Sequence, residues 1–257
     1  MKKLIYILLM LAYGCTPAFS QTINGAYVQA LYKKYPTVKS NFCPACKLWV
    51  NPYFKSIADT QRHMPLCEYE YLSQTNYAKT ATANIPRTGI YAAWHPVTGQ
   101  PNEDNVYTVA NKVVKSKNPK DEIAKGHVNA WILNAWCADA AILSDTYTFN
   151  AACEDQNQNV GTEIATENIT RQLLGHVDVE IWGGTFSSQG TFTDGKVTDT
   201  YPAYYWKIMR YGGQTVCYWM PNLITETQAM LPQRIVTYQQ LLENLGFDPE
   251  VIFPPAK

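Results

Sequence analysis

Two short stretches of this chain carry residue types that can hydrolyse an ester. The first is Lys125-Gly126-His127, in which a glycine joins a cation to an imidazole. A histidine with the ordinary pKa of about 6.5 can take a proton from water at neutral pH, and hydrolysis of an unactivated ester needs such a base. The stretch predicts His127 as a general base. A glycine–histidine pair alone is also typical of a structural histidine.

The second stretch ends in Arg171. Glu167 follows Asn159 at +8 and Arg171 follows it at +12, so on a helix turning about 100° per residue the three share one face. Magnesium takes hard oxygen ligands and keeps several waters, so the Asn159 amide oxygen and substrate phosphate oxygens could hold it. Glu167 would orient a metal-bound water, and Arg171 would balance charge on the phosphate. In the alternative, Asn159 only starts a helix, while Glu167 and Arg171 form an i,i+4 ion pair.

Several elements must position these residues. A short strand at Thr146–Phe149 is predicted to deliver Asn150, followed by a polar loop over 151–158 and a helix over 159–174 that Gly175 ends. Trp131–Ser144 is apolar enough for a buried helix. Lysines crowd the approach to His127, which indicates either a solvated loop or a guide for an anionic substrate. They are Lys112, Lys115, Lys117, Lys120 and Lys125.

Local patterns predict the other elements. These are an amphipathic helix over 22–34, a strand over 88–94, a strand over 177–182, a Gly/Ser/Thr-rich loop over 183–200, a hairpin around Gly212-Gly213, and a helix that a capping box starts at Thr237 and Gly246 ends. Without a linker or a repeat, the chain predicts one α+β domain.

The N-terminus predicts a secretory signal peptide over residues 1–20. Two lysines precede an apolar run from Leu4 to Ala12, and the small residues Ala18 and Ser20 flank Phe19 before Gln21. The run is shorter than the about 20 residues of a membrane span, and no later segment is that long and apolar. The mature chain, 21–257, is expected to be secreted or periplasmic. A lipoprotein anchored through Cys15 is the weaker interpretation.

Six cysteines remain after that cut: Cys43, Cys46, Cys67, Cys137, Cys153 and Cys217. Disulfides are the default in an oxidising compartment, and the fifteen pairings stay open. A bridge at Cys153 would brace the region of Asn150. Alternatively, Cys43, Cys46, His63 and Cys67 have ligand types and spacings that could hold a structural zinc. Lys and Arg number 21 and so do Asp and Glu, so net charge does not indicate a nucleic-acid binder.

From Ile123 to its end, the chain resembles the DNA/RNA non-specific endonuclease family, whose ββα-metal site usually begins with Asp-Arg-Gly-His. Lys125-Gly126-His127, Asn150 and Asn159-x-Gly161 with Glu167 and Arg171 carry the resemblance. Three later segments resemble that family's closing strands and helix: Tyr205–Ile208, Met220–Asn222 and Thr237–Pro254. The cysteine-rich part, 21–120, matches poorly, whereas 121–257 would form the ββα-metal core and the closing elements.

The resemblance implies a central, mainly antiparallel sheet flanked by helices, with a ββα-metal motif. It implies His127 as the general base and Asn159 as the direct ligand of magnesium (Mg2+), for which Mn2+ could substitute. Glu167 would contact the metal's water shell and Arg171 the phosphate. Asn150 would hold the base or the substrate in place.

The chain departs from the family pattern at five positions. Lys125 replaces an arginine and keeps its charge but not its two-pronged phosphate contact, and Ala124 replaces an aspartate. Cys153 and Glu154 stand where the family has Pro-Gln, and Glu163 replaces a common tryptophan. These departures put the rate and the substrate preference in question.

The sequence therefore predicts a secreted, magnesium-dependent, sugar-non-specific endonuclease that hydrolyses phosphodiester bonds of DNA and RNA. Lys125 and Arg171 would balance charge, and contacts to phosphate and sugar would make cleavage independent of base sequence. The alternative is a secreted nucleic-acid-binding or adhesion module of the same fold that has lost catalysis, an idea motivated by Ala124 and Lys125. Preference for DNA or RNA and oligomeric state, a homodimer included, stay open.

Overall fold

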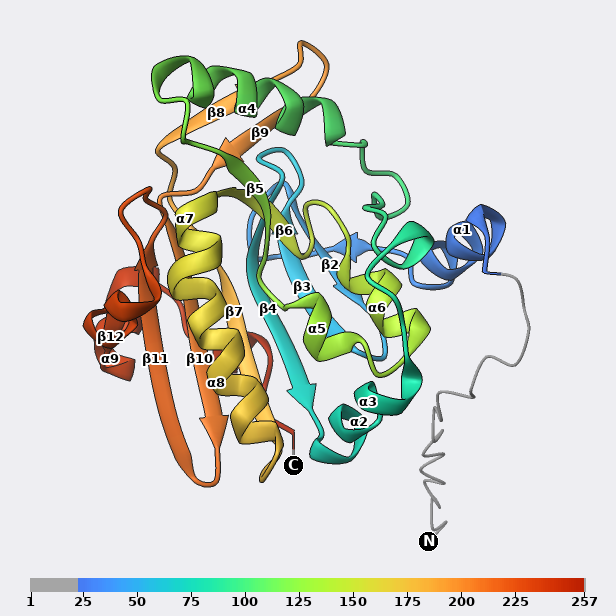
Figure 1. Cartoon of the computed structure of the whole chain (residues 1–257), viewed down its shortest axis with the longest axis vertical. Coiled ribbons are helices and arrows are strands. Elements are labelled where there is room, and N and C mark those ends of the chain that lie inside the picture. The colour runs from blue at the N-terminus through green and yellow to red at the C-terminus, as the bar shows by residue number, and fades with distance from the viewer. Residues whose placement is uncertain (1–22, 257) are drawn as a thin grey trace, which may run out of the picture.

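The computed structural model describes residues 23–256 (Figure 1). The predicted signal peptide and Cys15 lie outside the described residues. Among the described residues no helix is long and apolar enough to cross a membrane.

One large antiparallel sheet forms the centre of the fold. Its eight strands lie in the order β1-β2-β3-β4-β7-β10-β11-β12, and each neighbouring pair is antiparallel. The strands are β1 (Val38–Lys39), β2 (Cys46–Val50), β3 (Phe54–Asp59), β4 (Met64–Leu72), β7 (Val179–Phe186), β10 (Tyr204–Tyr211), β11 (Gln214–Pro221) and β12 (Ile235–Val236). The fold is thus α+β with a mainly antiparallel sheet, as the sequence predicts.

The cysteine-rich N-terminal part supplies half of this sheet. Strands β2 to β4 form a meander, and β4 pairs with β7, which joins this part to the later strands. Trp182 of β7 and Trp206 of β10 are fully buried, so both of these neighbouring strands contribute large apolar side chains to the core.

Helices cover the sheet and its edges (Figure 1). They are α1 (Gly25–Lys34), α2 (Gln74–Ala78), α3 (Thr80–Ala83), α4 (Asp104–Lys117), α5 (Trp131–Asn134), α6 (Ala138–Ser144), α7 (Gln156–Gln158), α8 (Ile164–Leu174), α9 (Tyr238–Leu245) and α10 (Pro249–Ile252). Helix α8 lies along the face of β7 and β10 in Figure 1, where Leu174 joins the same buried cluster as Val179 and Met209.

Two strand pairs stand outside the large sheet. β5 (Ile123–His127) pairs with β6 (Ala151–Asp155), and β8 (Gly190–Thr193) pairs with β9 (Thr198–Tyr201). Figure 1 shows α4 and the β8–β9 hairpin together at one end of the molecule, with β5 and β6 beneath them. The β5–β6 pair therefore lies between that outer layer and the central sheet.

The predictions that rest on local turn and cap chemistry are confirmed. The β10–β11 hairpin turns at Gly212 and Gly213, whose φ angles of +51° and +78° favour glycine. Thr237 and Gln240 form the reciprocal capping box of α9, and Gly246 ends that helix with φ of +73°.

Predictions that depend on distant partners fail around the candidate site. The loop predicted over 151–158 begins with β6, all of whose residues are buried, whereas the predicted strand Thr146–Phe149 forms no strand. A polar sequence can still form a strand when a partner such as β5 satisfies its backbone. Asn150 therefore lies just before a strand and not at the end of one.

Three other predicted elements differ as well. Residues 88–94 contain the short 3-10 turn η1 (Gly89–Tyr91) and no strand. The predicted helix Trp131–Ser144 is divided into α5 and α6, and most of the loop over 183–200 forms the end of β7 and the β8–β9 hairpin.

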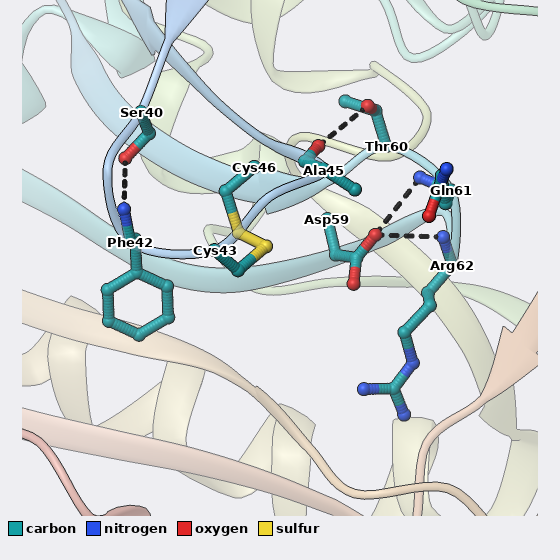
Figure 2. The surroundings of a disulfide bond; sticks show 9 residues. All are labelled: Ser40, Phe42, Cys43, Ala45, Cys46, Asp59, Thr60, Gln61 and Arg62. Atoms are coloured by element: carbon teal, nitrogen blue, oxygen red, sulfur yellow. Dashed lines mark hydrogen bonds between the residues drawn. A yellow bond between two sulfur atoms is a disulfide. The ribbon is translucent and has the colours of Figure 1, made fainter.

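Cys43 and Cys46 form a disulfide at the start of β2 (Figure 2). Nearby, Asp59 accepts hydrogen bonds from the backbone N–H groups of Gln61 and Arg62, each at 3.0 Å. Cys67, Cys153 and Cys217 are free and buried. The expectation that all six cysteines pair is therefore wrong, and no bridge at Cys153 braces the site. The disulfide also removes the thiolates of Cys43 and Cys46, two of the four ligands that the alternative zinc site needed.

Candidate active site

The order of elements around His127 is strand, strand, helix. β5 pairs with β6 in antiparallel register, with His127 opposite Ala151 and Lys125 opposite Cys153. After β6 the chain passes through α7 and a π-helical segment, η2 (Asn159–Glu163), into α8. Gly161 takes a non-helical conformation inside η2, and an added Cβ there would lie 2.9 Å from the carbonyl oxygen of Glu226. A side chain at position 161 would therefore meet the backbone of Glu226.

An open pocket of about 580 Å³ contains most of the predicted site residues. His127, Lys125, Asn159, Glu167 and Arg171 all line it, from β5 on one side and from η2 and α8 on the other. Asn150 does not. The pocket therefore brings these five side chains together.

His127 is held by a carboxylate. Its Nε2 lies 2.7 Å from Oδ1 of Asp145, and the ring of Trp94 packs on it with centroids 4.6 Å apart. An ionised carboxylate can only accept a hydrogen bond, so the Nε2–H group of His127 donates to Asp145 and Nδ1 keeps its lone pair. Within residues 23–256 no hydrogen bond involves Nδ1. The geometry suits a base whose orientation is fixed and whose reactive nitrogen has no protein partner.

Sequence reasoning missed Asp145 and the residues beside it. Asp145 follows α6 and is 18 positions from His127, so no periodic pattern links the two. Arg87 lies 3.9 Å from the same carboxylate and packs on the ring of Trp131 at 4.8 Å. Arg87, Trp94 and Trp131 all line the pocket, which adds a cation and two aromatic walls.

Asn150 holds the loops that carry this pair. Its Oδ1 accepts from the backbone N–H of Asn129 at 2.7 Å, and its Nδ2 donates to the carbonyls of Asn129 at 2.9 Å and Ser144 at 2.7 Å. Asn129 follows β5 two residues after His127, and Ser144 precedes Asp145. Asn150 is fully buried. It can position His127 and Asp145, and it does not reach the pocket.

Asn159, Glu167 and Arg171 face the pocket without engaging one another. No ion pair joins Glu167 to Arg171 within residues 23–256, so the simple helix-pair alternative is not formed. Among the described residues Arg171 hydrogen-bonds to two neutral groups, the Tyr77 hydroxyl at 3.3 Å and Asn168 Oδ1 at 3.5 Å. The amide and the carboxylate are hard oxygen donors, so this donor set fits a magnesium ion that keeps several waters.

Lys125 is already engaged inside the protein. Its Nζ lies 2.5 Å from Asp104 and 3.0 Å from the Tyr147 hydroxyl, and the rings of Trp94, Tyr107 and Tyr147 surround it. Burial alone would raise the pKa of Asp104, but hydrogen bonds from Lys125 and Tyr147 outweigh it and the pKa is lowered. Of the other clustered lysines, 112, 115 and 117 lie on α4 and 120 after it, and none lines the pocket.

The departures Glu154 and Glu163 lie buried behind β5, where Lys207 of β10 pairs with Glu163. Burial raises the pKa of Glu154, and the nearby charge of Glu163 raises it further. The Glu154 side chain packs directly on Gly126, where an added Cβ would lie 2.1 Å from its Oε2 and 2.4 Å from its Cβ. Glycine is therefore required before His127 by this close packing.

A second group of ligand types lies away from the pocket. His63, Glu103 and Asp199 are buried, and their ligand atoms all lie within 4.8 Å of one another. This group could hold a metal ion. None of the three lines the pocket that contains Asn159. Sequence analysis did not find this group, because it placed His63 with Cys43, Cys46 and Cys67 as a possible zinc site.

Comparisons with known proteins bear on the fold. No family model matches the chain, and no curated protein matches it. One similar solved structure is a chain of the EndoG/EndoGI complex, described in connection with the mechanism of EndoG inhibition. The TM-score is 0.57 at 13% identity, over 77% of this chain and 83% of that chain. At this identity the likeness concerns the fold alone.

Proposed function

We propose that the protein is a magnesium-dependent endonuclease that hydrolyses phosphodiester bonds of DNA and RNA. The observation that supports this most directly is one open pocket lined by His127, Asn159, Glu167 and Arg171, with Asp145 behind the histidine. A base, hard oxygen donors and an exposed guanidinium are what phosphodiester hydrolysis needs. The likeness to a chain of the EndoG/EndoGI complex is compatible with the proposal.

In this mechanism Nδ1 of His127 takes a proton from the attacking water. Asp145 keeps the proton on Nε2, which leaves the Nδ1 lone pair for water, and its charge stabilises the imidazolium that forms. Asn150 holds the two loops at the required separation through its three buried hydrogen bonds.

Asn159 would hold the magnesium directly, and Glu167 would orient one of its waters. When bound, the ion supplies Lewis acidity that polarises the phosphate and stabilises the leaving oxygen. Arg171 has no competing anion among the described ion pairs and would contact the phosphate with its planar fork. Arg87 would add a second cation on the opposite wall.

The substrate would be bound through phosphate and sugar, with the half-buried Trp94 at the pocket wall as the aromatic side chain nearest to the bases. Such contacts tolerate any sequence, which suits both DNA and RNA. The Cys43–Cys46 disulfide is consistent with an oxidising location, and it supports the proposal that the enzyme acts outside the cytoplasm or in a periplasm.

The second candidate is a nucleic-acid-binding module of the same fold without catalysis. The engagement of Lys125 by Asp104 favours it, because this cation replaces the family's arginine yet is already paired within the protein. The intact set of His127, Asn159 and Glu167 in one pocket favours the enzyme.

The test compares purified native protein with His127→Ala on plasmid DNA and on RNA, with magnesium and with a chelator. We expect the substitution to lower the cleavage rate about 10²- to 10⁴-fold, since that is what a general base contributes. His176→Ala is the matched control, because His176 is exposed beyond the end of α8. Equal rates for native protein and His127→Ala would refute the mechanism. A native protein that binds labelled oligonucleotide without cleaving it would favour the binding module.

A further inference from the structure

Three segments far apart in the sequence meet at one buried group of side chains. His63 lies in the turn between β3 and β4, Glu103 lies just before α4, and Asp199 lies in β9. His63 Nδ1 is 2.8 Å from Asp199 Oδ1. The three residues are 8%, 0% and 1% exposed, and their ligand atoms all lie within 4.8 Å of one another.

The group is short of hydrogen-bond partners and of positive charge. Within residues 23–256, Oε2 of Glu103 and Oδ2 of Asp199 are buried and no donor group pairs with them. The two carboxyl groups lie close enough to share a proton, and the Thr148 hydroxyl donates to the other oxygen of Glu103. Burial raises the pKa of Glu103 and the charge of Asp199 raises it further. The nearby cation Lys125 is committed to Asp104. Buried polar atoms without partners are rare in folded proteins and indicate a missing ligand.

We infer that His63, Glu103 and Asp199 bind one divalent transition-metal ion, with zinc as the preferred ion. A neutral imidazole and two carboxylates balance the two positive charges of the ion. One nitrogen and two oxygen donors suit zinc, whereas magnesium and calcium prefer oxygen alone. Tetrahedral ligands at about 2.0–2.2 Å from one zinc lie about 3.3–3.6 Å apart, so side-chain shifts that draw the three groups closer together would complete the site.

The ion would have a structural role. It would join the β3–β4 turn to the outer layer formed by α4 and the β8–β9 hairpin, where Thr200 already donates a backbone hydrogen bond to Arg62 at 3.0 Å. Glu103 is adjacent to Asp104, which pairs with Lys125 of β5. The ion would therefore stabilise the layer that packs on β5, separately from the magnesium proposed at Asn159.

Metal content and thermal unfolding of the full-length protein test this inference without any activity assay. We expect native protein to retain about one equivalent of zinc after dialysis, and stripping with a strong chelator to lower Tm. Returning zinc to about one hundred times its Kd should restore about 5–10 °C. Asp199→Asn and Glu103→Gln should lose the bound zinc and the Tm response.

Asn159→Ala is the matched comparison, because it removes the proposed magnesium ligand and should keep both the zinc and the Tm response. Because the native protein alone supplies metal content and Tm, the test does not depend on the variants folding. The inference would be overturned if the native protein contained no zinc, or if native protein and Asp199→Asn contained equal amounts. The three side chains would then share protons and bind no metal. Loss of zinc from Asn159→Ala alone would also overturn it by placing the ion in the pocket.

Discussion

Two histidine–aspartate pairs in this protein have nearly the same local geometry and different surroundings. His127 lies 2.7 Å from Asp145, and His63 lies 2.8 Å from Asp199. Both histidines are largely buried, at 9% and 8% exposed. The pair at His127 borders an open pocket, whereas the pair at His63 is closed by the carboxylate of Glu103. The pairing alone therefore does not decide what a histidine can do.

A charged residue beside each histidine–aspartate pair determines whether the region attracts an anion or a cation. Arg87 lies 3.9 Å from Asp145, so that region carries a cation beside the pocket and suits a phosphate. Glu103 beside Asp199 gives the other region excess negative charge, which suits a metal cation. Access to solvent and one neighbouring residue thus separate the proposed catalytic arrangement from the proposed structural one.

Matched substitutions of the two aspartates should give opposite results. Asp145→Asn places an amide beside Nε2 of His127 and allows the proton to move to Nδ1, where the base needs a lone pair. We expect the cleavage rate to fall about 10- to 100-fold, the usual loss when a partner that orients a histidine is removed, while Tm changes little. Asp199→Asn should lower Tm and leave cleavage at 25 °C within a few-fold of native. Rates on plasmid DNA and unfolding curves measure both effects.

A cleavage loss in Asp199→Asn as large as that in Asp145→Asn would show that the two regions do not act separately. The zinc content of Asp145→Asn serves as the control, since it should equal that of the native protein.

Sequence alone predicts what local chemistry decides. The turn at Gly212-Gly213 and the capping box at Thr237 were predicted because the residues that form them are neighbours in the chain. The side chains of Asn159, Glu167 and Arg171 were predicted to share a face, and they line one pocket although Gly161 interrupts the helix between them.

Sequence fails where partners are distant. β6 contains Glu154 and Asp155, which suggest a solvated loop, yet pairing with β5 and burial against the sheet determine its conformation. His63 and Asp199 are 136 positions apart, so no spacing rule brings them together, and the nearby cysteines suggested a different set of partners for His63.

The backbone at or just before each histidine also differs between the two regions. His63 itself takes a φ of +48° in a tight turn, whereas His127 depends on Gly126 packing against Glu154. Gly126→Ala should force Glu154 to move and cost about 1–3 kcal/mol of stability, the range for overpacking a core. Denaturant unfolding measures this, with Gly25→Ala as the control because a Cβ there meets no atom within 4 Å. An unfolding free energy equal to the native value would show that Glu154 yields freely.

Lys125 lies between the two regions. If the regions act independently, replacing Lys125 should change the cleavage rate and the stability less than the other substitutions do. Its Nζ pairs with Asp104, the neighbour of Glu103, and its strand ends at His127. Lys125 pairs with the Asp104 carboxylate, whereas Arg171 hydrogen-bonds to neutral groups. Lys125→Met should therefore lower the cleavage rate only a few-fold and cost about 1 kcal/mol of stability, as a partly exposed ion pair does. Arg171→Met should lower the cleavage rate by more, since its guanidinium has no competing anion. A larger loss of cleavage in Lys125→Met than in Arg171→Met would mean that Lys125 leaves Asp104 to bind phosphate, and that the outer layer and the pocket act as one unit.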